Sequence, residues 1–221
     1  MFWTLFALSL VVSYLIGSIN AAVIISKLVA HKDVRDFGSG NAGMTNVMRV
    51  MGFLPGLLTF LFDGLKGAAV CALAKFVVFP YVYSNLGYEF LRPEYAVFYC
   101  AFLCLIGHIF PVFFGFKGGK GVATSLGILF VCQYQTAIIG FSLFLIIFIF
   151  SRIISLGSVC ACAAVPFINI IFAKGDNTSV LIQCLLMGAA AGLVIFMHRS
   201  NIVRLIKGEE KKLIVNKKGA K

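Results

Sequence analysis

Two short glycine-rich segments hold most of the polar side chains that could do chemistry in this sequence. Residues 38–46 read GSGNAGMTN, and residues 115–121 read GFKGGKG. Glycine lets the backbone approach a ligand closely, and irregular backbone leaves N–H groups that can hold an anion. The sequence around both segments is strongly apolar, so we expect two anion-binding loops on an integral membrane protein.

The first loop combines backbone, hydroxyl and amide donors. Its candidate ligand-binding residues are Gly38, Ser39, Gly40, Asn41, Thr45 and Asn46. We expect a helix over residues 47–51 whose N-terminus faces the bound anion, with Arg49 able to hold a phosphate through two hydrogen bonds. The alternative is a plain loop whose polar residues only cap that helix.

The second loop sets lysines beside glycines. Its candidate phosphate-binding residues are Lys117, Gly118, Gly119, Lys120 and Gly121. A Walker A site is excluded because glycine stands at position 121, where Ser or Thr is required. Residues 38–43 match the dinucleotide fingerprint but lack the preceding strand that it needs. The alternative for the second loop is a basic turn on the inner membrane face.

Five more polar residues interrupt or end apolar stretches. Asp63 and Lys66 would share a helix face, and both a neutralising ion pair and a ligand-lining pair are open. We expect His108 to be a packed, hydrogen-bonded histidine. His198 and Asn201 would face the membrane surface together, and histidine exchanges a proton near neutral pH. The alternative for this last segment is an interfacial amphipathic helix.

Apolar helices must position these groups. The chain is 61% hydrophobic and 12% charged, with a mean hydropathy of +1.00. Stretches near the ~20 residues of a membrane span occur at 2–26, 53–80, 95–114, 122–150, 154–173 and 180–197. The stretch 122–150 is too long for one helix, and Gln133-Tyr134-Gln135 marks a hairpin within it. We predict an all-α integral membrane protein, one polytopic domain over residues 1–221, with about seven transmembrane helices and six as the alternative.

The positive charges predict the orientation. Of the 19 Lys and Arg residues, fifteen fall in the segments 27–52, 117–121, 151–154 and 198–221. The positive-inside rule therefore places these segments in the cytoplasm and the N-terminus outside. Six crossings would put the tail outside, so the rule favours seven. The net charge of +11 suits an anionic lipid surface, and we expect no nucleic-acid partner because no nucleic-acid module accompanies the tail.

The seven cysteines all fall in apolar stretches and form no C-x-x-C pair. We expect them to pack as small apolar residues rather than to bind a metal. The sequence gives no reason to expect a metal, a cofactor or an obligate protein partner.

Four motifs in one order resemble the bacterial acyl-phosphate:glycerol-3-phosphate acyltransferases, the PlsY family. They are the first loop, Asp63-x-x-Lys66-Gly67, the run from Gly107-His108 through the second loop to Thr124, and His198-Arg199-x-Asn201-Ile202-x-Arg204-Leu205. The resemblance extends from the first apolar stretch to about residue 210. Ala42 and Met44 stand where the family commonly has proline and alanine. Glu209 directly follows Gly208, so Glu210 is the candidate for the family's structural glutamate.

The resemblance implies a multi-pass enzyme of the bacterial inner membrane that acts early in phospholipid biosynthesis. It would transfer a fatty acyl group from acyl phosphate to the 1-hydroxyl of glycerol 3-phosphate. The products would be 1-acyl-glycerol 3-phosphate and inorganic phosphate. Ser39, His198 and Asn201 would be catalytic, and the loop donors with Arg49 and Lys66 would bind the substrates. Acyl phosphate is already activated, so we expect Ser39 to act as a positioning hydrogen-bond donor and not to become acylated. His198 and the departing phosphate are both open as the proton acceptor.

Two alternatives belong to other classes. Residues 31–36 fit H-x-x-x-x-D, the signature of glycerolipid acyltransferases that use acyl-CoA or acyl carrier protein. Two fixed positions arise easily by chance, and that class has a largely surface-bound catalytic domain. An anion transporter would also contain glycine-broken helices, but its site would lie near the membrane midplane.

Overall fold

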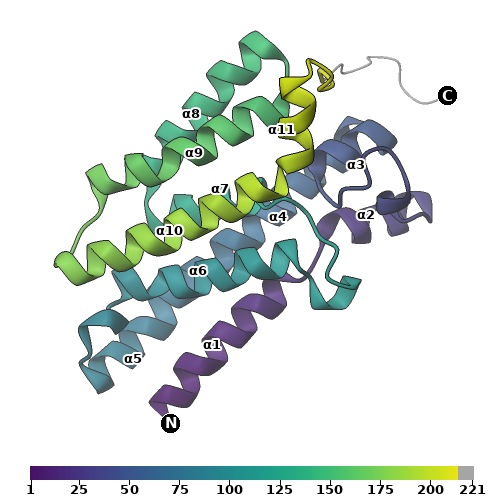
Figure 1. Cartoon of the computed structure of the whole chain (residues 1–221). Coiled ribbons are helices and arrows are strands. Elements are labelled where there is room, and N and C mark those ends of the chain that lie inside the picture. The colour runs from purple at the N-terminus through teal and green to yellow at the C-terminus, as the bar shows by residue number, and fades with distance from the viewer. Residues whose placement is uncertain (214–221) are drawn as a thin grey trace.

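The computed structural model describes residues 1–213 and is built from helices (Figure 1). The α-helices are α1 (Phe2–Gly17), α2 (Ala21–Ala30), α3 (Met44–Met51), α4 (Phe53–Leu73), α5 (Phe79–Leu86), α6 (Pro93–Ile109), α7 (Val122–Cys132), α8 (Tyr134–Ser151), α9 (Ile154–Phe172), α10 (Asn177–Met197) and α11 (Arg199–Ile206). Short helical turns lie between some of them, namely η1 (Val34–Asp36), η2 (Ala74–Val78), η3 (Glu89–Leu91) and η4 (Val112–Phe114). This described part contains no strand, which confirms the predicted fold class.

Between residues 1 and 213, six segments are long and apolar enough to cross a membrane. They are Phe2–Ala30, Phe53–Leu86, Pro93–Phe114, Tyr134–Ser151, Ile154–Phe172 and Asn177–Met197. The predicted break in the stretch 122–150 is confirmed, because Gln133 has non-helical backbone between α7 and α8. Helix α7 has only 11 residues, or about 16 Å, against a hydrocarbon core of about 30 Å. The number of complete crossings and the cytoplasmic face therefore stay predictions.

Helices approach one another closely where glycines face backbone. A Cβ atom on Gly17 of α1 would lie 2.2 Å from the carbonyl oxygen of Cys104 in α6. A Cβ on Gly127 of α7 would lie 1.9 Å from the carbonyl oxygen of Gly64 in α4. Small residues allow such contacts between membrane helices, whose packing cannot rely on the hydrophobic effect. Glycine thus allows the close packing of α1 on α6 and of α4 on α7. The second loop connects α6 to α7.

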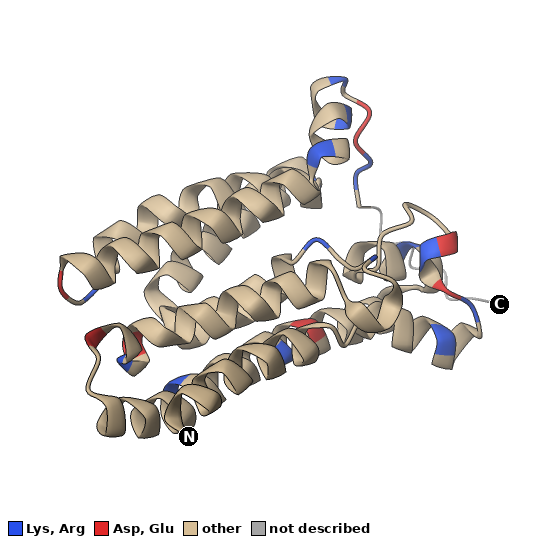
Figure 2. Ribbon diagram, turned by 60° about the horizontal axis from the view of Figure 1, so that its bottom comes forward, with Lys and Arg blue, Asp and Glu red and all other residues tan. Residues whose placement is uncertain are grey.

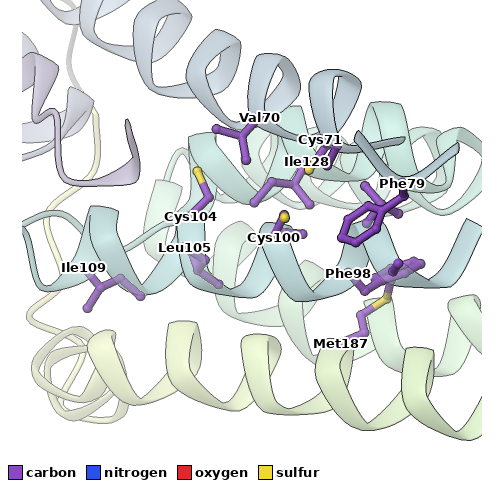
Figure 3. Close-up of a cluster of buried hydrophobic side chains, with 14 of the residues drawn as sticks. Val70, Cys71, Phe79, Phe98, Cys100, Cys104, Leu105, Ile109, Ile128 and Met187 are labelled. Carbon is purple, nitrogen blue, oxygen red and sulfur yellow. The ribbon is translucent and has the colours of Figure 1, made fainter. Parts of the chain in front are cut away.

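The interior of the bundle is filled around α6. Cys71, Phe79, Cys100 and Cys104 are fully buried, and Leu105 is nearly so, as Figure 3 shows. The other four cysteines are half-buried, and all seven are free thiols. The interpretation of the cysteines as packing residues fits this arrangement.

The polar loops gather at one end of the bundle. Figure 1 shows α2, α3 and α11 together at this end, with the N-terminus at the opposite one. In Figure 2, α11 and the loops around it carry much of the basic charge. The predicted tail 198–221 begins with α11, and its positions beyond 213 lie outside the described residues. The helices therefore bring segments from the first, middle and last parts of the chain to one place.

Candidate active site

A cavity of about 460 Å³ opens where these segments meet. Its polar lining includes Ser39, Asn41, Thr45, Arg49, Lys120, His198, Asn201, Arg204 and Glu210. Its apolar lining comes from α7, α8 and α9, including Leu126, Leu129, Phe141, Phe144, Ala161 and Val165. The cavity therefore joins a polar, cationic region to an apolar region between helices, a shape that suits an amphiphilic anion.

Most of the sequence-predicted residues line this cavity. Those that do are Gly38, Ser39, Asn41, Thr45, Asn46, Arg49, Lys120, Gly121, His198 and Asn201. Gly40, Lys66, Lys117, Gly118 and Gly119 are not among its lining residues. The structure thus divides one set of candidates into residues that face the cavity and residues that support it.

Asn46 holds the first loop in shape. Its Oδ1 accepts a hydrogen bond from the backbone N–H of Ser39 at 2.8 Å. Its Nδ2 donates to the carbonyl oxygens of Val34 and Phe37, each at 3.0 Å. The side chain is 2% exposed, and Gly38 adopts a left-handed φ of 64° beside it. The amide of Asn46 is thus occupied by the loop itself, and it presents Ser39 at the cavity.

Helix α3 begins earlier than the sequence indicates. It starts at Met44 with Gly43 as N-cap, rather than near residue 47. Its first turn, including Thr45, therefore lines the cavity, and helix N-termini favour anions. Arg49 lies on the next turn, is exposed, and also lines the cavity. The first turn of α3 and the guanidinium-bearing Arg49 thus both line the cavity, and their binding of an anion stays a prediction.

Two glycines of the second loop, Gly118 and Gly119, pack against α6 and do not line the cavity. The N–H of Gly118 donates to the carbonyl of Ile109 at 3.1 Å, and that of Gly119 donates to His108 at 3.2 Å. A Cβ on Gly118 would lie 2.0 Å from the carbonyl oxygen of His108. Both positions therefore need glycine because the loop lies directly against the end of α6. Lys117 is exposed outside the cavity.

Lys120 is the cation that this packing directs inward. Its Nζ donates to Oδ1 of Asn201. Nδ2 of Asn201 donates to Oε1 of Glu210 at 2.6 Å, and Nε of Arg204 donates to Oε2 at 2.6 Å. Burial lowers the pKa of Lys120 to about 8, although the negative charge of Glu210 acts to raise it. A lysine with this pKa is still mostly charged at neutral pH, yet it is poorly hydrated and ready to bind an anion.

Glu210 organises the last segment. It also accepts a hydrogen bond from Oγ of Ser155 at 2.8 Å. Burial opposes its charge, but hydrogen bonds from Asn201, Arg204 and Ser155 outweigh this and keep the pKa of Glu210 below its ordinary value. The interpretation of Glu210 as a structural glutamate agrees with these contacts. Arg204 was not among the site residues predicted from the sequence. Its three-residue spacing from Asn201 could have indicated it, because residues three apart share a helix face.

His198 caps the C-terminus of α10, and one of its ring nitrogens is hydrogen-bonded to the helix backbone. Its Nδ1 lies 2.8 Å from the carbonyl oxygen of Val194, and a carbonyl oxygen only accepts, so Nδ1 carries a proton. Burial, reinforced by the charge of Lys120, lowers the pKa of His198 to about 4. The ring is therefore neutral at pH 7, and its Nε2 holds a lone pair that can accept a proton or a hydrogen bond.

Asp63, Lys66 and His108 form a buried ionic cluster beneath the second loop. Lys66 Nζ lies 2.9 Å from Asp63 Oδ1 and 3.0 Å from His108 Nδ1. It also donates to the carbonyl of Ile19 at 2.6 Å. Asp63 and His108 reach the cavity wall, but Lys66 does not. Of the two alternatives for Asp63 and Lys66, the geometry favours the neutralising pair.

Arg35 joins the two loops and was not among the predicted site residues. Its Nε and Nη2 donate to the carboxylate of Asp33 at 3.0 and 2.8 Å. Its Nη1 donates to the carbonyl oxygen of Phe114, just before the second loop, at 2.7 Å and to that of Lys117, within the loop, at 3.2 Å. The hydrogen bonds from Arg35 lower the pKa of Asp33. The only sequence signal for this contact is the Asp-x-Arg spacing just before the first loop.

The H-x-x-x-x-D pattern forms no comparable site. His31 ends α2 with a left-handed φ of 53°, and both His31 and Asp36 are exposed and absent from the cavity lining. This geometry agrees with the interpretation of the pattern as a chance match.

The sequence is similar to proteins named glycerol-3-phosphate acyltransferase along nearly its whole length. A family model described as glycerol-3-phosphate acyltransferase matches residues 7–208. The glycerol-3-phosphate acyltransferase of Finegoldia magna is 43% identical over 204 residues, covering 92% of this chain and 93% of that protein. The enzyme of the same name from Aquifex aeolicus is 39% identical over 207 residues, covering 92% and 97%.

The fold is similar to crystal structures of PlsY, an integral membrane glycerol 3-phosphate acyltransferase. The glycerol 3-phosphate form superposes with a TM-score of 0.80 at 32% identity, covering 95% of this chain and 96% of that one. The lysophosphatidic acid form gives a TM-score of 0.78 at 31% identity, with the same coverage. Sequence and fold therefore agree that this chain belongs to the PlsY family of glycerol-3-phosphate acyltransferases and is a multi-pass membrane enzyme.

Proposed function

We propose that this enzyme takes its acyl group from an acyl phosphate and transfers it to the 1-hydroxyl of glycerol 3-phosphate. The products are 1-acyl-glycerol 3-phosphate, a lysophosphatidate, and inorganic phosphate. The observation that carries the proposal is the cavity itself, in which Lys120, Arg49 and Arg204 adjoin an apolar space between α7, α8 and α9. Such a cavity suits a donor made of a phosphate and a fatty chain, without a bulky nucleotide or carrier protein.

We propose substrate-binding roles for the residues that face the cavity. Arg49, Lys120 and the first turn of α3 supply positive charge and N–H groups for the phosphates. Asn41 and Thr45 add side-chain donors. Of the other candidates from the sequence, Gly118 and Gly119 act by packing the second loop on α6, and Lys66 acts by pairing with Asp63. Gly40 and Lys117 lie outside the cavity lining, and we assign their side chains no contact with substrate.

The reaction requires one bond to form and one to break. The 1-hydroxyl oxygen of glycerol 3-phosphate attacks the carbonyl carbon of acyl phosphate, and the bond from that carbon to the phosphate oxygen breaks. Ser39 donates a hydrogen bond as negative charge develops on the oxygens. The hydroxyl proton passes either to Nε2 of His198 or to the departing phosphate. Asn201 holds Lys120 in place, so the cation stays beside the leaving group.

A purified-protein assay tests this donor directly. The protein is supplied with glycerol 3-phosphate and, in separate reactions, palmitoyl phosphate, palmitoyl-CoA or palmitoyl carrier protein. We expect lysophosphatidate and inorganic phosphate in equal amounts from palmitoyl phosphate alone. Product from palmitoyl-CoA or the carrier protein, with none from palmitoyl phosphate, would overturn the proposal.

A further inference from the structure

A second, smaller cavity of about 70 Å³ lies between α6, α7, α9 and α10. Apart from Ser125, its lining residues have apolar side chains, which include the thiol of Cys162 and the thioether of Met187. Four of them, Phe98, Leu105, Ile128 and Met187, are seen together in Figure 3. The roles proposed above make no use of this cavity.

The two cavities share a wall. Ser125 and Leu129 of α7 and Cys162 and Val165 of α9 line both of them. Along α7 the shared wall begins at Ser125, about 6 Å beyond Gly121, and extends to Leu129, about 12 Å beyond it. Its far end therefore lies well away from the cations at the loops. A chain whose phosphate sits near Lys120 would reach this wall with its hydrocarbon part.

We propose that the second cavity receives the distal end of the donor's acyl chain and sets the longest chain that the enzyme uses efficiently. Met187 and Ala191 of α10 are then specificity-determining residues. Both are buried, with 5% and 8% exposure, and both line the second cavity but not the first. The inference rests on the proposed function, because it needs an acyl chain anchored by its phosphate in the first cavity.

Side-chain size at these positions would act as a length gauge. Ala191 leaves space that a larger residue would fill, and Met187 fills space that a smaller residue would open. Burying one methylene contributes about 0.8 kcal/mol, which is about fourfold in affinity. The ratio of kcat/KM for a long and a short acyl phosphate should therefore change about fourfold for each methylene that is displaced or newly accommodated.

The test measures this ratio for a series of saturated acyl phosphates of increasing length. Ala191→Leu should lower the long-to-short ratio, and Met187→Ala should raise it. Ala189→Leu is the matched control, because Ala189 is exposed on the same helix and lines neither cavity, so its ratio should equal that of the wild type. The ratio compares substrates within one preparation, so the amount of folded protein does not affect it.

Ala137→Leu tests the competing path of the chain. Ala137 lines only the first cavity, on α8. A ratio that shifts in Ala137→Leu but not in Ala191→Leu would overturn the proposal and place the chain end between α8 and α9. Equal loss for all chain lengths in Ala191→Leu would overturn it as well. A wild-type enzyme inactive with every acyl phosphate would instead refute the proposed donor.

Discussion

Lys120 reaches the cavity while Lys117, three residues earlier, remains outside it. We therefore expect Lys120→Ala to raise the apparent KM for glycerol 3-phosphate by about 10- to 100-fold, since a hydrogen bond to a charged group is worth about 1.5–3 kcal/mol. Steady-state kinetics on purified enzyme measure this. Lys117→Ala is the matched control and should change KM much less. Unchanged KM and kcat in Lys120→Ala would remove this residue from substrate binding.

The charge on Lys120 also predicts a pH dependence. Its pKa is lowered to about 8, so the ammonium loses its proton, and its attraction for phosphate, as pH rises through 8. We expect kcat/KM for glycerol 3-phosphate to fall between pH 7 and 9, because this parameter reports groups of the free enzyme. His198, with its pKa lowered to about 4, is neutral throughout that range and adds no change.

Lys120→Arg separates this explanation from others. A guanidinium keeps its charge throughout pH 7 to 9, so the variant should show a flat profile over this range even where its absolute activity is reduced. The same decline in Lys120→Arg as in the wild type would assign the titration to another group.

The backbone N–H of Ser39 donates a hydrogen bond to the side-chain amide oxygen of Asn46, which holds Ser39 at the cavity. Its hydroxyl is then free to act as a donor to developing charge, and Ser39→Ala should reduce kcat by about 10²–10³-fold. Ser39→Thr should also fail, because the added methyl crowds the loop. A trapping experiment distinguishes the roles: enzyme and radiolabelled acyl phosphate are mixed without glycerol 3-phosphate and quenched. An acyl ester on Ser39, formed and consumed at the rate of turnover, would establish a two-step mechanism instead.

At the scale of elements, the two loops depend on one another through Arg35. It donates to Asp33 on its own segment and to Phe114 and Lys117 of the other. We expect Arg35→Ala to lower kcat and kcat/KM together, because the loops lose their fixed separation. Arg35→Lys should restore little, since an ammonium cannot reproduce the planar fork that spans these acceptors.

A readout of loop order distinguishes this role from a general loss of stability. Cleavage by trypsin after Lys117 or Lys120 should accelerate in Arg35→Ala, while the melting temperature changes little. Lys32→Ala, a change of an exposed residue on the same connection, serves as the control and should leave both cleavage and activity unchanged. Unaltered cleavage in Arg35→Ala would show that the second loop keeps its position without this contact.

The sequence predicts the helices well, but it predicts poorly which loop residues line the cavity and which pack against other parts of the protein. Hydropathy locates the long helices and the break at Gln133, because lipid imposes a length and an apolar composition that are local properties of the chain. It cannot indicate that Gly118 and Gly119 pack on α6, since that depends on a contact with a distant segment. For the same reason Asn46 and Lys66 resemble ligand-binding residues in sequence, whereas their hydrogen bonds join parts of the protein.

At the scale of the whole molecule, the site links the segments around residues 120, 155 and 201–213. The six-crossing and seven-crossing topologies place these segments differently relative to the membrane. Asn201 contacts both Lys120 and Glu210, and Glu210 in turn accepts from Ser155. Leu213 also donates to the carbonyl of Arg152 at 2.8 Å. With six crossings, the segments around residues 120 and 155 would lie on opposite membrane faces, about 30 Å apart. These contacts need them on one face, which favours seven passes with a short α7.

Cysteine labelling in intact cells tests the resulting N-out, C-in arrangement. Asn85→Cys places a thiol at an exposed position of α5, and Lys211→Cys places one at an exposed position next to Glu210 in the chain. Helices α5 and α11 lie at opposite ends of the bundle (Figure 1). A membrane-impermeant maleimide should label position 85 in intact cells and position 211 only after permeabilisation. The unmodified protein is the control, since its seven cysteines are buried or half-buried. Labelling of position 211 from outside would reverse the orientation, and would then require glycerol 3-phosphate to reach the cavity from the other face of the membrane.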